Sequence, residues 1–191
     1  MDQHLIEQLQ LLSHAMFQKG FFGIHHGALS AKIANNRFII NTKDAIFDNL
    51  TTKDLIELTH IQDYRWHQAS MDSLIHQQIY SHISEAKFVT YAMPPFTTAY
   101  ALENSIIIPR DYFAHRILGT IHVYDPKNFD DWYDRASSEI YLEFLHRKTS
   151  LLVIKGYGIY AYDRDSLQMA KRIAILENSC RILLLGAQAR P

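Results

Sequence analysis

The residues best suited to carry out chemistry lie around Asp72. Asp72 and His76 are four residues apart, so on a helix they share a face and can hydrogen-bond. Such a pair is either a catalytic dyad or an ordinary pair on a surface helix, and we favour the second interpretation. Ser70 is a suitable cap for this helix. That start would place Asp72 in the first turn, where the helix dipole favours an anion.

Three further side chains are candidate metal ligands outside this segment. His115, His122 and Asp125 are close in sequence, but their spacing matches no recognised ligand motif. Eleven histidines are many for 191 residues, yet they are scattered along the chain. The histidine count alone therefore does not predict a metal centre.

Composition excludes several classes of function. Nineteen basic and twenty acidic residues leave a net charge of −1, so no basic field would attract nucleic acid. The single cysteine, Cys180, excludes an intramolecular disulfide and a cysteine-based zinc cluster. No apolar run approaches the roughly 20 residues that span a bilayer, and the first residues do not resemble a secretory signal. We therefore expect a cytoplasmic protein that does not bind membranes.

Hydrophobic periodicity predicts short strands that alternate with longer helices. The predicted helices cover residues 2 to 18 and about 131 to 146, and others begin near Thr51 or Thr52, near Ser70, near Pro94, and near Asp163 or Asp165. The predicted strands are Arg37–Asn41, Tyr64–His67, Phe88–Ala92, Ser105–Ile108, Ile121–Tyr124, Leu151–Ile154 and Gly158–Tyr162. Turn signals at Asn35-Asn36 and Lys155-Gly156 predict antiparallel pairing. The pattern is typical of a layered α/β domain.

Several different short motifs follow one another along the whole chain, and their order indicates the fold. They are Gly27-Ala28-Leu29-Ser30-Ala31-Lys32, Leu50-Thr51-Thr52-Lys53-Asp54-Leu55-Ile56, Ser70-Met71-Asp72, the strand ending Tyr91-Ala92-Met93, and Leu151-Leu152-Val153-Ile154-Lys155-Gly156. Their order and separation resemble the class II aldolase/adducin family. The resemblance implies one α/β domain over residues 1–191, with a central, mainly antiparallel sheet flanked by helices.

The resemblance also implies a divalent metal, which the family holds with a His-x-His pair and a third histidine. Tyr91, Met93 and Lys155 stand at the positions matched to these ligands. A neutral phenol is a poor ligand, a thioether is soft, and an ammonium group repels a cation. We therefore predict that the family's metal site is lost and that no metal cofactor is needed. A zinc-like ion would require a relocated site, for which His25-His26 is a candidate if the pair does not bind phosphate or simply face solvent.

Site roles follow from the same resemblance. Asp72 would be the acid-base residue, and Tyr112 matches a tyrosine that reaches a neighbouring subunit's site. Lys155 would either take the metal's electrostatic place, or act as a Schiff-base nucleophile, or form an ion pair with Asp72, which we favour. The substrate-binding candidates are Ser30, Lys43 and Ser70.

Two functional hypotheses result. The first is a divergent family member that lacks the usual metal and acts as a binding or oligomeric module. The second is an aldehyde-lyase that acts on a small sugar-phosphate or carbonyl substrate through Asp72, Lys155 and Tyr112, or through a relocated metal. In both, the family's fourfold rings imply a homo-oligomer, such as a tetramer, with a small phosphorylated or carbonyl ligand.

Overall fold

The centre of the molecule is an eight-stranded sheet. The computed structural model describes residues 3–24 and 26–188. The strand order is β3-β2-β1-β4-β8-β7-β6-β5. Every neighbouring pair is antiparallel except β6 and β7, which are parallel. The predicted, mainly antiparallel sheet is therefore confirmed. The strands are β1 Ala28–Ala34, β2 Arg37–Asn41, β3 Leu55–Thr59, β4 Phe88–Ala92, β5 Ile106–Ile107, β6 Ile121–Tyr124, β7 Leu151–Ile154 and β8 Gly158–Asp163.

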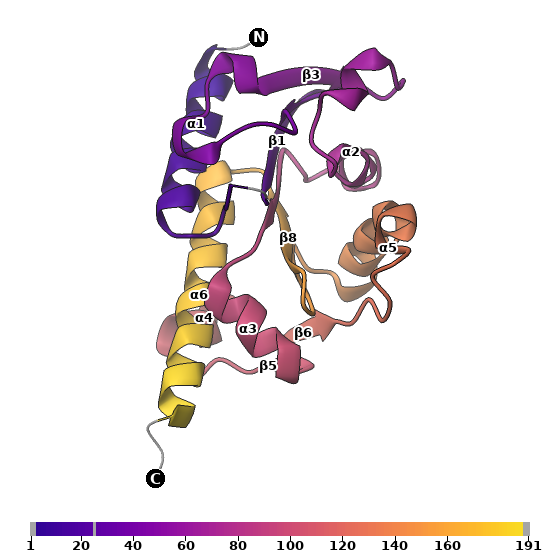
Figure 1. Ribbon diagram of the computed structural model, residues 1–191. Helices are drawn as coiled ribbons and strands as arrows, with labels where there is room; N and C mark the ends of the chain where they lie inside the picture. The colour runs from indigo at the N-terminus through magenta and orange to yellow at the C-terminus, as the bar shows by residue number, and fades with distance from the viewer. Residues whose placement is uncertain (1–2, 25, 189–191) are drawn as a thin grey trace.

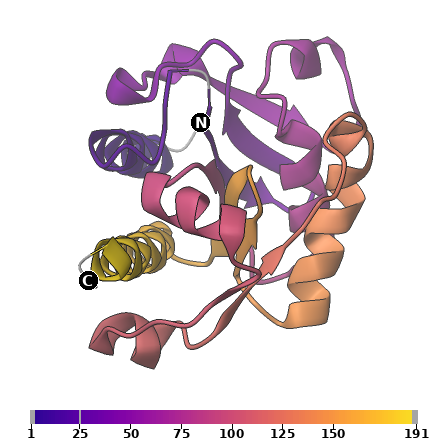
Figure 2. The same ribbon diagram turned by 60° about the horizontal axis from the view of Figure 1, so that its bottom comes forward.

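Helices cover both faces of this sheet. Figure 1 shows α1 and α6 on one side and α2 and α5 on the other, and Figure 2 shows α4 beside the end of α6. None of the helices in the described ranges is both long and apolar enough to cross a bilayer. The helices are α1 Gln3–Gln18, α2 Ser73–His82, α3 Pro95–Glu103, α4 Tyr112–Ile117, α5 Trp132–Arg147 and α6 Ser166–Gln188.

Alternation along the strands explains the three layers. In β2, Phe38 and Ile40 enter the core beneath α2 and α5, whereas Ile39 enters the core beneath α1 and α6. Successive strand residues point to opposite faces of a sheet, so a strand that is apolar at every position must be covered twice. The sequence of β4, Phe88–Ala92, is buried throughout for the same reason.

Three sequence predictions about local structure were wrong. The helix expected near Thr51 is a single 3₁₀ turn, Thr52–Asp54, that Thr51 and Asp54 cap reciprocally, and the chain then pairs with β2 as β3. The strand expected at Tyr64–His67 is another 3₁₀ turn, capped by the Asp63 side chain. Helix α2 begins at Ser73 rather than directly after Ser70. In the first two cases, local side-chain caps decided structure that the hydrophobic pattern left open.

The start of α3 is held by a side chain from α6. The buried Glu177 carboxylate accepts hydrogen bonds from the Phe96 and Thr97 backbone N–H groups, at 2.9 and 2.8 Å, and from the Thr97 hydroxyl at 2.8 Å. The first N–H groups of a helix have no partner within it, and a carboxylate also suits the positive end of the helix dipole. Because α3 follows β4 after only Met93 and Pro94, this contact fixes the chain next to the site.

Candidate functional site

A small cavity lies where α2 begins, at the end of β4. Its volume is about 160 Å³, and it brings together Lys43, Ser70 and Asp72 from the predicted set. These side chains come from a loop after β2 and from the turn that leads into α2. One cavity is thus lined by three of the four residues predicted to bind substrate or to act as acid and base. The fourth, Ser30, does not line it. The lining is Ile24, His26, Gly27, Asn41, Lys43, Ala45, Phe47, Ser70, Met71, Asp72, Tyr91, Tyr133 and Tyr157.

Asp72 is the buried acid of this cavity. It occupies the N-cap position of α2, but its side chain makes no capping bond. Instead, its carboxylate accepts a hydrogen bond from the Tyr160 hydroxyl of β8. Burial raises the pKa of Asp72 to about 6, against which the Tyr160 and Ser70 hydroxyls act in the opposite direction. Desolvation of the charged form therefore dominates, and the carboxyl can exchange a proton near neutral pH.

Tyrosines surround this carboxyl. The Tyr91 hydroxyl donates to the Tyr157 carbonyl at 2.9 Å, and the Tyr133 and Tyr157 hydroxyls lie 2.8 Å apart. The Tyr91 and Tyr157 ring centroids are 4.7 Å apart. Burial, followed by the Asp72 charge, raises the pKa of all three phenols. They are therefore neutral hydrogen-bonding groups at physiological pH.

Tyr157 is a cavity residue whose place in the site the sequence did not predict, because Lys155 was expected there. Gly158 follows it with φ +133, and a Cβ on that residue would lie 2.4 Å from the Ala92 carbonyl oxygen. Only glycine lets β8 start so close to the end of β4, and this approach brings Tyr157 onto Tyr91. The signal in the sequence was the Tyr-Gly pair that opens β8, two residues beyond Lys155.

Lys155 lies outside the cavity. Its Nζ is 3.8 Å from Asp125 Oδ2, and its side chain is 45% exposed. The favoured ion pair with Asp72 is therefore wrong, because Asp125 takes the place of Asp72 as partner. Asp125 in turn accepts a hydrogen bond from the Lys127 backbone N–H. His115 and His122 are exposed, and they do not form a potential metal site with Asp125, because no such cluster of ligands is found in the described ranges.

The expected surface pair of Asp72 and His76 is also wrong. His76 is fully buried, and its Nδ1 lies 2.6 Å from the Ser30 hydroxyl. That hydroxyl is also 2.7 Å from the Tyr80 hydroxyl, so Ser30 belongs to a buried network beneath α2 rather than to the cavity lining. Burial lowers the pKa of His76 to about 3, which keeps the imidazole neutral.

The remaining predictions fall at separate places. Tyr112 is 71% exposed on α4, where its ring contacts Phe113, and it does not line the Asp72 cavity of its own chain. Of the candidate pair His25-His26, His26 lines the cavity, and His25 lies outside the described residues.

The side chains at the cavity do not fit a divalent metal ion. The lining offers one carboxylate, Asp72, which is bonded to Tyr160, and one imidazole, His26. The phenols of Tyr91 and Tyr157, by contrast, are neutral. Catalytic zinc usually takes three ligands among His, Cys, Asp and Glu. Within residues 3–24 and 26–188, no three such side chains are grouped so that they could hold a metal.

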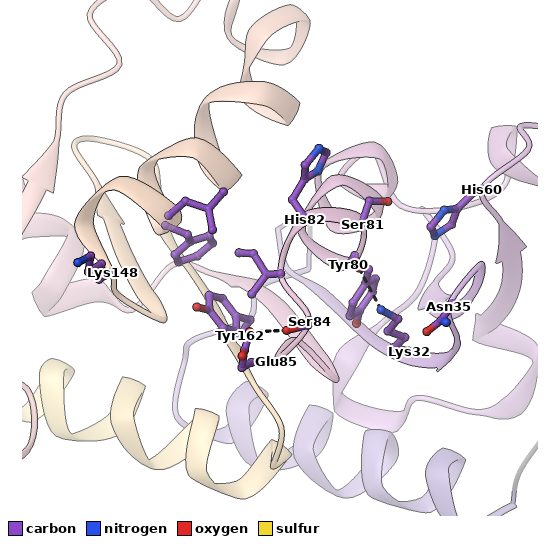
Figure 3. Close-up of a pocket in the computed structure, with 13 residues that line it drawn as sticks. Lys32, Asn35, His60, Tyr80, Ser81, His82, Ser84, Glu85, Lys148 and Tyr162 are labelled. Carbon is purple, nitrogen blue, oxygen red and sulfur yellow. Dashed lines mark hydrogen bonds between the residues drawn. The ribbon is translucent and has the colours of Figure 1, made fainter.

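A larger hollow of about 590 Å³ lies elsewhere, between the C-terminal ends of α2 and α5. Figure 3 shows Lys32, Asn35 and His60 at one end of it and Lys148 at the other. The Lys32 ammonium donates to the Tyr80 carbonyl at 3.0 Å, a usual role for a cation at a helix C-terminus. None of the predicted site residues lines this hollow. We therefore place the candidate site at the smaller cavity.

The fold places an acidic residue at the start of α2 and a buried strand, β4, directly after that helix. Comparison with known sequences and structures shows which class of protein has this arrangement. Residues 7–184 match the family described as Class II Aldolase and Adducin N-terminal domain. The chain belongs to this family, as its motifs predicted. No curated protein matches the chain.

Solved structures are similar over almost the full length. L-fuculose-1-phosphate aldolase from Thermus thermophilus has a TM-score of 0.85 at 22% identity, covering 98% of this chain and 97% of that one. YgbL from Escherichia coli, described as a putative aldolase/epimerase/decarboxylase, has a TM-score of 0.79 at 16% identity, with 99% and 92% covered. A sugar-phosphate aldolase from Thermotoga maritima has a TM-score of 0.71 at 13% identity, with 98% of each chain covered. These likenesses establish the fold.

Proposed function

We propose that this chain is a small-molecule-binding member of the class II aldolase/adducin family that works without the usual metal ion, with the cavity beside Asp72 as its site. One observation carries the proposal. Lys43, Ser70 and Asp72 converge on that cavity, and its wall includes Tyr157 and Tyr91, the latter at a position matched to a metal-binding histidine of the family. A polar, partly enclosed cavity of this kind is a default binding site.

The ligand class follows from size and charge. A volume of about 160 Å³ is smaller than the roughly 300–1,000 Å³ of drug-sized sites, so the occupant is a small metabolite. Lys43 lies exposed at the cavity and supplies a cation for a phosphate or carboxylate group, and the Ser70 hydroxyl supplies a further polar contact. A small phosphorylated or carbonyl compound meets these requirements.

Calorimetry with a panel of small phosphorylated and carbonyl compounds tests the proposal, using protein treated with a chelator. We expect binding to survive chelation. The Lys43→Met variant should bind a phosphorylated ligand about tenfold more weakly, which corresponds to about 1.4 kcal/mol. Lys53→Met, at an exposed lysine outside the cavity lining, is the matched control and should bind normally. Loss of all binding on chelation would contradict the proposal.

A second candidate function is an aldehyde-lyase, and the raised pKa of Asp72, to about 6, favours it. A general acid-base group works best with a pKa near the operating pH. In this version Asp72 moves the proton, and a Tyr112 can reach the cavity only from a neighbouring subunit. Aldehyde release from sugar phosphates should then persist with a chelator and disappear in Asp72→Asn.

Borohydride trapping with candidate aldehydes separates the routes within the lyase hypothesis. Lys155 lies outside the cavity beside Asp125, so we expect no trapped adduct on it and unchanged release by Lys155→Ala. A labelled Lys155 would instead support the Schiff-base route.

A further inference from the structure

We infer that the cavity beside Asp72 receives a small organic cation, a protonated or quaternary amine, whose positive group lies against the Asp72 carboxylate and the Tyr91, Tyr133 and Tyr157 side chains. This inference rests on the function proposed above, because it assigns a ligand class to the same cavity. It differs in naming the charge of the group that enters deepest.

The first step is the charge of the cavity. Asp72 is only 4% exposed, and the ion pairs found among residues 3–24 and 26–188 give it no Lys, Arg or His partner. Its carboxylate is hydrogen-bonded only by neutral hydroxyl groups in the described ranges, those of Tyr160 and Ser70. A buried charge without a counter-charge is unfavourable, so a cation that enters the cavity is strongly favoured over a neutral molecule.

The second step is the reach of that charge. Tyr91 lies on β4, Tyr133 on α5 and Tyr157 directly before β8. The charge of Asp72 disfavours ionisation of all three phenols. Three elements therefore experience the same negative potential, which marks the cavity wall as a whole as favourable to positive charge.

The third step is the chemistry of the wall. Aromatic rings attract cations through their quadrupole, and quaternary ammonium groups are recognised in this way by clusters of aromatic side chains. Such a group needs only a negative potential and aromatic surface. It does not need three convergent His, Cys, Asp or Glu ligands, a grouping that is not found among residues 3–24 and 26–188. The tyrosines and Asp72 therefore suit an organic cation better than a metal.

The fourth step is the opposite end of the cavity. Lys43 and Asp72 both belong to the lining, but Lys43 is exposed whereas Asp72 is buried. The cavity is therefore negative within and positive at its exposed side. A ligand with an ammonium group at one end and a hydroxyl, carboxylate or phosphate at the other matches this polarity.

The test compares two probes of the same shape. Choline carries a quaternary nitrogen, and 3,3-dimethylbutan-1-ol has a neutral carbon in its place. We expect calorimetry to give at least tenfold tighter binding of choline. Asp72→Asn should remove that preference, whereas Asp44→Asn, at an exposed acid outside the lining, should retain it. Equal binding of the two probes by the native protein would overturn the inference.

A second variant pair guards against a folding defect in Asp72→Asn. Tyr133 is 43% exposed, so its replacement should be tolerated. Tyr133→Phe retains the ring and should keep most of the choline affinity, whereas Tyr133→Leu should lose several-fold. If phosphorylated compounds bind but choline shows no advantage over its neutral isostere, the cation inference fails and the proposed function stands. If neither probe nor any panel compound binds, both fail.

Discussion

At the scale of single residues, Asp72 is retained at an energetic cost. A carboxyl that is buried without a cation loses hydration, and its ionised form is disfavoured. The neighbouring buried titratable group, His76, is held neutral, because burial lowers its pKa to about 3. Of these two buried groups, only Asp72 lines the cavity. A carboxylate held in so unfavourable a place is typical of functional sites.

The burial of Asp72 predicts a pH-dependent difference between native protein and Asp72→Asn. Burial raises the pKa of Asp72 from 3.8 to about 6, so the folded state binds the proton more tightly than the unfolded chain. The native protein therefore loses stability as pH rises from about 4 to about 6. Above pH 7, Asp72→Asn should be more stable by about 3 kcal/mol.

Urea unfolding of both proteins between pH 4 and pH 8 measures this difference. It should fall below about 1 kcal/mol near pH 4 and approach zero below about pH 3, where the Asp72 carboxyl is protonated in both the folded and the unfolded state. Protonation of His76 affects native protein and variant alike, so it cancels in the comparison. A difference that does not change with pH would show that Asp72 ionisation carries no folding penalty.

At the scale of elements, much of the architecture was predictable. Arg37–Asn41, Phe88–Ala92, Ile121–Tyr124 and Leu151–Ile154 were predicted with their observed ends, because short segments rich in apolar residues between turn residues leave few alternatives. The site was less predictable. The position of Tyr157 depends on how closely β8 approaches β4, and the engagement of Ser30 depends on a contact 46 residues away in sequence. Neither is encoded in local spacing.

That close approach gives a prediction about the start of β8. Gly158→Ala should destabilise the fold by about 2–4 kcal/mol, because the added Cβ meets the Ala92 carbonyl oxygen at 2.4 Å and φ is +133. Gly186→Ala is the matched control. It lies in α6 with no atom within 4 Å of an added Cβ, so alanine should stabilise by about 0.5–1 kcal/mol. Thermal unfolding checks both, and an unaffected Gly158→Ala would mean that β8 shifts freely.

At the scale of the whole molecule, exposed apolar side chains gather between β5 and the end of α4. Ile108, Tyr112, Phe113 and Ile117 are 61%, 71%, 66% and 52% exposed. A group of large apolar side chains on a surface marks an interaction site. We propose that a second copy of this chain covers it, which would also place Tyr112 against a neighbouring subunit.

Light scattering after size exclusion tests this assembly. The native chain should be an oligomer, and Tyr112→Asp combined with Phe113→Asp should shift it toward the monomer. Tyr64→Asp is the control, since Tyr64 is 74% exposed on a 3₁₀ turn at a different place in the chain, and it should leave the mass unchanged. A native protein that is monomeric at every concentration would contradict the assembly.

The carboxylate of Glu177 gives α6 a second structural role besides covering the sheet. Its hydrogen bonds connect α6 to the start of α3, which lies next to the cavity because α3 begins three residues after β4 ends. Shortening the tail by its final turn should therefore be harmless. Truncation before position 177 would remove the hydrogen bonds that hold the start of α3, and it would destabilise the adjacent edge of the cavity beside Asp72.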